Sequence, residues 1–137
     1  MTNSITVSIQ TNVSLDLAWE YFTNPVHIVK WYFASSDWCS PFAENDLRIG
    51  GKFKTRMEAK DGSFGFDFSG AYSVVILHKQ IDCVLNDNRK MSILFTQQGN
   101  QTIIQESFEP ETENTLELQQ IGWQAILNNF KNYIESI

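Results

Sequence analysis

The feature that most constrains this chain is a long stretch in which apolar and polar residues alternate with a period of two. From residue 46 to residue 109 only short turn sequences interrupt it, such as Asp61-Gly62, Asn86-Asp87-Asn88 and Gly99-Asn100. Alternation of this kind is typical of half-buried strands, and such turn residues mark hairpins. We therefore predict six consecutive antiparallel strands, the first of them a short strand over residues 46–49, in a sheet that curves where glycines fall.

Before this stretch the sequence indicates one strand and two short helices. Residues 5–9 alternate and are rich in β-branched side chains, as expected of a strand, and residues 15–22 place apolar side chains at helical spacing. Asn24-Pro25 predicts the start of a second helix that continues to residue 32, with Asn24 as its cap. Residues 33–45 follow no period, and we expect them to form a loop that acts as a gate.

The last predicted element is a long C-terminal helix that Asn114 caps, with Glu117 in position for a capping box. Its apolar residues cover more than half of its circumference, which is wider than the stripe of a surface helix. We therefore expect contacts on two sides, one with the sheet and one with the short helices or the loop. Gly122 is expected to let this helix approach the sheet closely.

Composition excludes several classes of protein. The length of 137 residues predicts one domain over residues 1–137, and 42% hydrophobic with 19% charged residues excludes a disordered chain. A net charge of -6 argues against a nucleic-acid or anionic-membrane surface, and no apolar run is long enough to span a membrane. Residues 1–10 lack a signal-peptide pattern, so we predict reduced thiols at Cys39 and Cys83 and a cytoplasmic location.

Aromatic residues make up 13% of the chain and suit either a solid core or the wall of an apolar ligand cavity. For a single residue both interpretations stay open, and for the whole set we favour a cavity because the last helix is apolar on two sides. The predicted ligand-binding residues are Phe53, Met57, Phe64, Phe66, Phe68, Tyr72, Phe95, Glu106 and Phe108 on strands, Trp123 and Phe130 on the last helix, and Trp31, Trp38 and Phe42 at the rim.

Glu106 is the polar residue of most interest in this set. It alternates with Ile104 and Phe108, so it points inward if they do, and a buried carboxylate with a raised pKa could serve as an acid, a base or a ligand anchor. A shifted register that turns Glu106 outward is the alternative. His27 and His78 are far apart in the sequence and show no metal-ligand spacing, so we expect neither a metal nor a cofactor.

Several stretches resemble the single-domain bacterial relatives of the activator of the 90-kDa heat-shock-protein ATPase, in the SRPBCC (START-like, polyketide-cyclase) superfamily. They are residues 46–53, 57–62, 65–68, 108–114 and 122–130, and the resemblance extends from Ile5 to Glu135. It implies an α+β helix-grip fold in the order strand, two short helices, six strands, long helix. It also implies a cavity between the sheet and the long helix, which many relatives use for apolar molecules.

We therefore predict a module that binds an apolar or amphipathic small molecule, and not an enzyme. Two alternatives stay open. The resemblance implies a chaperone-linked interaction through an exposed surface, although the two-domain co-chaperones rely on a separate N-terminal domain for a major contact. A cyclase- or hydrolase-like enzyme would instead use Glu106 in the cavity, with Tyr72 and one histidine as the other titratable groups.

Overall fold

The computed structural model describes residues 4–137. Residues 1–3, which belong to the expected domain and to the stretch where no signal peptide is expected, lie outside the described residues. The elements in chain order are β1 (Ile5–Thr11), α1 (Leu15–Thr23), α2 (Pro25–Trp31), β2 (Trp38–Asn45), β3 (Lys52–Ala59), β4 (Gly65–Ile76), β5 (Gln80–Leu85), β6 (Lys90–Gln98), β7 (Gln101–Phe108) and α3 (Leu116–Glu135).

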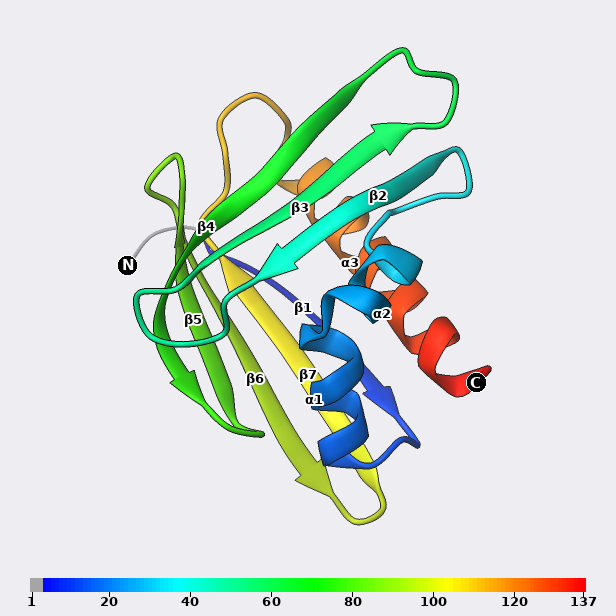
Figure 1. Ribbon diagram of the computed structural model, residues 1–137, viewed down its shortest axis with the longest axis vertical. Coiled ribbons are helices and arrows are strands. Elements are labelled where there is room, and N and C mark those ends of the chain that lie inside the picture. The colour runs from blue at the N-terminus through cyan, green and yellow to red at the C-terminus, as the bar shows by residue number, and fades with distance from the viewer. Residues whose placement is uncertain (1–3) are drawn as a thin grey trace.

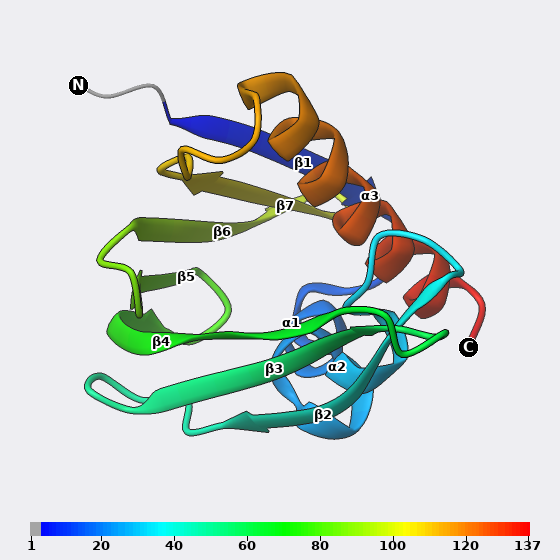
Figure 2. The ribbon, with the colours of Figure 1, turned by 90° about the horizontal axis from the view of Figure 1, so that it is seen from above.

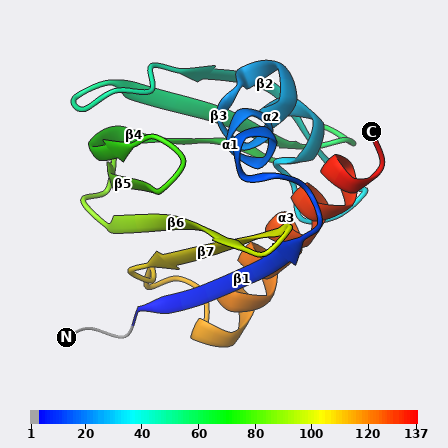
Figure 3. The same ribbon diagram turned by 90° about the horizontal axis from the view of Figure 1, so that it is seen from below.

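All seven strands form one antiparallel sheet in the order β1-β7-β6-β5-β4-β3-β2 (Figure 1). The six later strands are a meander, as predicted, and β1 pairs with the last of them from Ile5 opposite Phe108 to Thr11 opposite Thr102. The sheet curls into a C, and the three helices lie at its open side (Figure 2). Seen from below, α1 lies between the two halves of the curled sheet (Figure 3). This is the predicted α+β helix-grip architecture.

The start of the meander differs from the prediction. Residues 38–45, expected as a loop, form the edge strand β2, and only the segment before Trp38 remains irregular. The alternation is hidden there because Pro41 lies in the strand and the pairing with β3 shifts register between Cys39 and Phe42.

The strand predicted over residues 46–49 is wrong, because this segment is a tight turn. The N–H of Gly51 donates to the carbonyl of Arg48 at 2.8 Å, and the Arg48 side chain folds back onto Asp46 at 2.9 Å. Gly50 has a φ of +83°, and a Cβ at Gly51 would clash with the backbone oxygen of Asp46. The turn therefore requires both glycines.

The predicted cap is right for α2 and one residue off for α3. The Asn24 side chain accepts from the N–H of Val26 at 3.0 Å, as expected. In α3 the cap is Thr115, whose Oγ1 accepts from the N–H of Leu118 at 3.1 Å. The N–H of Asn114 donates instead to Glu111 at 2.7 Å, so Asn114 belongs to the loop before the helix.

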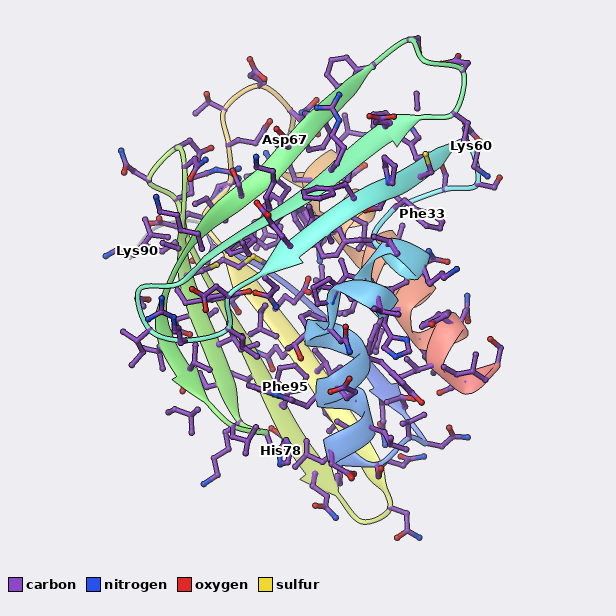
Figure 4. All side chains as sticks on the ribbon, in the orientation of Figure 1. Phe33, Lys60, Asp67, His78, Lys90 and Phe95 are labelled. Carbon is purple, nitrogen blue, oxygen red and sulfur yellow. The ribbon has the colours of Figure 1, made fainter. Side chains whose placement is uncertain are left out.

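Interlocked aromatic rings fill the space between the sheet and the second half of α3. The ring of Trp31 lies 4.7 Å from that of Phe130 and 5.1 Å from that of Phe22. Phe22 also contacts Phe95 of β6, which is labelled in Figure 4, at 5.4 Å. Leu127 and Phe130 of α3 are fully buried here. This half of the molecule is a solid core, and any larger opening has to lie at the other end of α3.

Candidate functional site

A groove of about 500 Å³ lies along the first half of α3. Its other walls come from the β3–β4 hairpin, the start of β2, the loop after α2, the β5–β6 turn and the loop before α3. Phe33, labelled in Figure 4, is in the loop between α2 and β2. The lining residues are Phe33, Ala34, Ser35, Trp38, Met57, Phe66, Phe68, Arg89, Glu111, Asn114, Leu118, Gln119, Gly122, Trp123 and Ile126.

The indole of Trp123 is the centre of the groove's aromatic wall. Its ring lies 5.1 Å from Phe68 of β4 and 5.2 Å from Phe108 of β7. Tyr32, at the end of α2, meets Trp123 edge-on at 6.3 Å and stacks on Phe68 at 5.9 Å. Four elements that are distant in sequence thus supply one cluster of aromatic rings around Trp123.

The two sides of the groove end in exposed apolar side chains. On the hairpin side, the rings of Trp38, Phe64 and Phe66 lie 6.0–6.1 Å apart, and we call these three residues the aromatic cluster. On the helix side, Leu118 and Ile121 are both 58% exposed, but only Leu118 lines the groove. A solvated groove with an apolar rim can take up an apolar molecule without first unfolding.

Gln119 fixes the polar end of the groove. Its Nε2 donates to the carbonyl oxygens of Asn114 at 2.9 Å and Glu111 at 3.1 Å, and its Oε1 accepts from the N–H of Glu111 at 3.0 Å. These bonds tie the loop before α3 to the helix. Arg89, which also lines the groove, donates from Nε to Asp87 at 2.7 Å.

A smaller inner cavity of about 50 Å³ lies deeper between the helices and the sheet. Its polar lining residues include Asn45, Tyr72 and Cys83, and the Tyr72 hydroxyl donates to the Asn45 side chain. Burial raises the pKa of the Cys83 thiol to about 12 and raises that of the Tyr72 phenol. Both groups are therefore neutral near pH 7, and they offer hydrogen bonds without charge.

Glu106 points inward and is 1% exposed. On β7 the buried positions Ile104, Glu106 and Phe108 alternate without a break, so the register shift that would turn Glu106 outward does not occur. Its Oε1 is buried and has no hydrogen-bond partner among the residues that the structure describes. Burial raises the pKa of this carboxyl to about 8, which favours its neutral, protonated form at pH 7.

The structure divides the residues predicted to bind a ligand into several groups. The groove includes Trp38, Met57, Phe66, Phe68 and Trp123, and the inner cavity includes Phe53, Phe68 and Tyr72. Phe108 packs behind Trp123. Whether any of them binds a ligand stays a prediction.

Seven of the predicted residues line neither opening: Glu106 and Phe108, described above, and five others. Trp31, Phe95 and Phe130 belong to the solid core, because the short helices reach far enough inward to fill the space around them. Phe42 is opposite Arg56 and lies on the outer face, because the bulge in β2 reverses the sides after Cys39. Phe64 is 61% exposed because it precedes β4 at the hairpin, beyond the reach of α3.

Sequence reasoning missed the polar lining residues Arg89, Glu111, Asn114 and Gln119. All four belong to turns or to the start of α3, where no periodic pattern shows which side chains face one another. Leu118 carried a signal, because it lies on the wide apolar arc of the last helix. That arc is wide because it includes a groove wall as well as a core face.

The described residues show neither a metal-binding group of side chains nor a helix that could span a membrane. Residues 4–137 contain no group of three His, Cys, Asp or Glu side chains arranged to hold a metal ion. In the same part of the chain, no helix has both the length and the apolar character that crossing a bilayer requires.

The curled sheet and the C-terminal helix define a helix-grip domain, and comparison of the sequence with protein families agrees. Residues 12–135 match the family described as activator of Hsp90 ATPase homolog 1-like protein. Because this match covers most of the chain, the protein belongs to that family. No curated protein sequence matches the chain significantly.

Solved structures of bacterial proteins support the assignment. An AHSA1-like protein from Aeromonas hydrophila is 38% identical, with a TM-score of 0.86 over 96% of this chain and 93% of the other. A protein from Cytophaga hutchinsonii is 49% identical, with a TM-score of 0.84 over 97% and 92% of the two chains. A protein from Chromobacterium violaceum shares the fold alone, with 18% identity and a TM-score of 0.85 over 96% of each chain.

Proposed function

We propose that this protein binds an apolar or amphipathic small molecule in the groove along the first half of α3. The observation that carries the proposal is the groove itself, with a volume of about 500 Å³ and mainly apolar lining residues. Ligand pockets in proteins typically measure ~300–1,000 Å³ and combine apolar walls with a few polar groups. The family's fold, which typically holds ligands, supports the same proposal.

Affinity would come mainly from the removal of apolar surface from water. A ligand that buries about 200 Å² of its own apolar surface gains about 5 kcal/mol at ~25 cal/mol per Å², before the losses of freedom on binding. Trp123 and Phe68 provide the broad wall for this contact. Arg89 and Gln119 at the polar end would orient the molecule.

Two residues of α3 provide a matched test. Leu118 and Ile121 have the same exposure, and only Leu118 lines the groove. We expect the neutral dye N-phenyl-1-naphthylamine to bind the wild type with enhanced fluorescence. Leu118→Gln should weaken this binding at least threefold, and Ile121→Gln should leave it within experimental error. Equal effects of the two substitutions would place the dye outside the groove and contradict the proposal.

The natural ligand can be sought directly. Native mass spectrometry of freshly purified protein should show an added mass that disappears after solvent extraction. Extracted material should compete with the dye for the wild-type groove. Extracted material that does not compete would mean that the added mass is bound elsewhere.

The aromatic cluster favours a second candidate function, an interaction with a heat-shock ATPase of the kind that the family description names. Phe64 is solvent-exposed, belongs to the aromatic cluster and does not line the groove. Phe64→Ser should therefore weaken capture by a bacterial 90-kDa heat-shock ATPase and leave dye binding unchanged. Capture that is absent, or that is indifferent to this substitution, would rule the aromatic cluster out as a chaperone contact.

A further inference from the structure

The buried carboxyl of Glu106 does not line the groove. A buried polar atom without a hydrogen-bond partner is rare in native proteins, because it loses its bonds to water and gains none. Oε1 of Glu106 is in this state, in the interior of the molecule. A residue kept at such a cost is expected to acquire a partner in another state of the protein.

Neighbours of Glu106 line the inner cavity, although Glu106 itself does not. On the inner face of the sheet, Glu106 is opposite Ile93 of β6, and Ile93 lines the cavity. Tyr32 and Cys83 also line the cavity, and both lie within electrostatic reach of Glu106. Lining residues from three different elements therefore lie between Glu106 and the cavity or near both, and a group that enters the cavity comes close to this carboxyl.

The chemistry of the inner cavity suits a neutral hydrogen-bonding group. Its lining includes the hydroxyls of Tyr32, Thr55 and Tyr72, and none of its lining residues in the described chain is a lysine, arginine or histidine. With no cation to balance it, a buried carboxyl favours its protonated form. A protonated carboxyl donates one hydrogen bond and accepts another, which is the pattern that a hydroxyl group complements.

The size and position of the inner cavity suit the small polar end of a molecule that lies in the groove. A water molecule requires a cavity of ~10–15 Å³. The inner cavity of about 50 Å³ can therefore hold a group of a few non-hydrogen atoms. Phe68 lines both the groove and the inner cavity, so the ring of this one residue lies between them. Displacement of that ring would join the two spaces.

We propose that the groove and the inner cavity are two parts of one site for a neutral amphipathic molecule, whose apolar body lies in the groove and whose hydroxyl end passes Phe68 and bonds to Glu106. This inference rests on the proposed function, because it assumes that the groove binds a ligand. It adds the chemical class of that ligand: a long-chain alcohol or a molecule with an equivalent neutral hydroxyl end. A carboxylate or an ammonium head would have to lose its hydration inside the cavity without an opposite charge.

The experiment uses displacement of N-phenyl-1-naphthylamine by three probes with the same ten-carbon chain at pH 6.5. These are decan-1-ol, decanoate and decylamine, which carry a neutral, an anionic and a cationic head. We expect decan-1-ol to displace the dye from the wild type at a concentration at least tenfold lower than either of the other two. Equal potency of the three probes, or a preference for either charged one, would overturn the inference without the use of any variant.

Substitutions at Glu106 then test the hydroxyl contact. Glu106→Leu removes both hydrogen-bonding atoms and should raise the concentration of decan-1-ol needed at least fivefold, once that concentration is corrected for the Kd of the dye in each protein. Glu106→Gln keeps a neutral donor and acceptor and should stay within about twofold of the wild type. Gln105→Leu, on the exposed face of the same strand, is the matched control and should have no effect.

The results separate this inference from the proposed function. If the dye binds, and Glu106→Leu does not change the potency of decan-1-ol, the groove is a ligand site and the inner compartment is not part of it. If the dye fails to bind the wild type, the result contradicts both the proposed function and this inference. If Glu106→Leu does not fold, the ranking of the three probes on the wild type still tests whether the site prefers a neutral hydroxyl head.

Discussion

At the scale of single residues, Glu106 shows how alternation along one strand can oppose the preference of a side chain. Glutamate favours solvent, but the residues on either side of it in the inward row, Ile104 and Phe108, are among the most buried of the chain. β7 lies between β1 and β6, so its register is held on both sides. A one-residue shift of β7 would move the Glu106 carboxyl into solvent, but it would also expose the whole inward row of apolar side chains.

The burial of Glu106 predicts how stability depends on pH. The pKa of this carboxyl is about 8 in the folded protein, raised by burial, against an ordinary value of 4.5. Between these values the unfolded chain has lost the proton that the folded protein keeps, so stability falls as pH rises. The contribution is at most ~1.4 kcal/mol per pH unit, and it ends above pH 8. Tyr32 and Cys83, the neighbouring titratable groups, have raised pKa values and stay neutral throughout.

Urea denaturation of the wild type and Glu106→Gln between pH 5 and pH 8 measures this contribution. The wild type should lose more stability than the variant as pH rises, and the difference between them should level off near pH 8. Parallel curves for the two proteins would show that Glu106 is ionised, or solvated, in the folded state.

At the scale of elements, α3 has two different halves. The second half is packed into the core through Leu127 and Phe130, and the first half carries Leu118 and Trp123 along the groove. A wide apolar arc predicted contacts on two sides, which is right for the second half. The close approach expected at Gly122 is wrong, because a Cβ there would meet no atom within 4 Å.

Gly122 therefore provides a prediction for the groove as well as for the helix. Gly122→Ala should raise the free energy of unfolding by about 0.5–1 kcal/mol, because alanine favours a helix and the new methyl group has room. Gly122→Met should project into the groove and weaken N-phenyl-1-naphthylamine binding at least fivefold without loss of stability. Chemical denaturation and dye titration of both variants check this. Unchanged dye binding in Gly122→Met would mean that the dye lies away from this part of α3.

The sequence did not predict the strand β2, and the position of β2 in the sheet explains why. An edge strand next to a bulge contains Pro41 and has partners on one side only, so its alternation is weak. The strand is detected only when its pairing with β3 is seen. Of the loop predicted over residues 33–45, only the segment before Trp38 is irregular, and its residues Phe33, Ala34 and Ser35 line the groove. That this segment acts as a gate stays a prediction.

At the scale of the whole molecule, the curl of the sheet decides where space remains. The three helices cover the open side of the sheet unequally, because α1 and α2 lie near one end of α3 (Figure 2). The groove lies along the other half of this helix. The β3–β4 hairpin, the start of β2, the loop after α2, the β5–β6 turn and the loop before α3 border the groove.

A ligand held in this groove should stabilise the whole fold, because it bridges α3 and the β3–β4 hairpin. At a free dye concentration ten times its Kd, the gain is about 1.4 kcal/mol, which raises the unfolding midpoint by roughly 3–6 °C. Differential scanning calorimetry should show the same shift for Ile121→Gln and a smaller one for Leu118→Gln at the same dye concentration. A midpoint independent of dye concentration would mean that folded and unfolded chains bind the dye equally.

The sequence by itself determined most of the element types, the antiparallel meander from residue 52 onward and the long apolar helix, because each depends on a period repeated along a few neighbouring residues. It left open whether Glu106 points inward. Only the tertiary structure decided which of the aromatic residues are core and which line the groove. That choice depends on how far the sheet curls and how deeply α1 and α2 reach into it. Both are properties of contacts between residues far apart in the chain, and no local pattern records them.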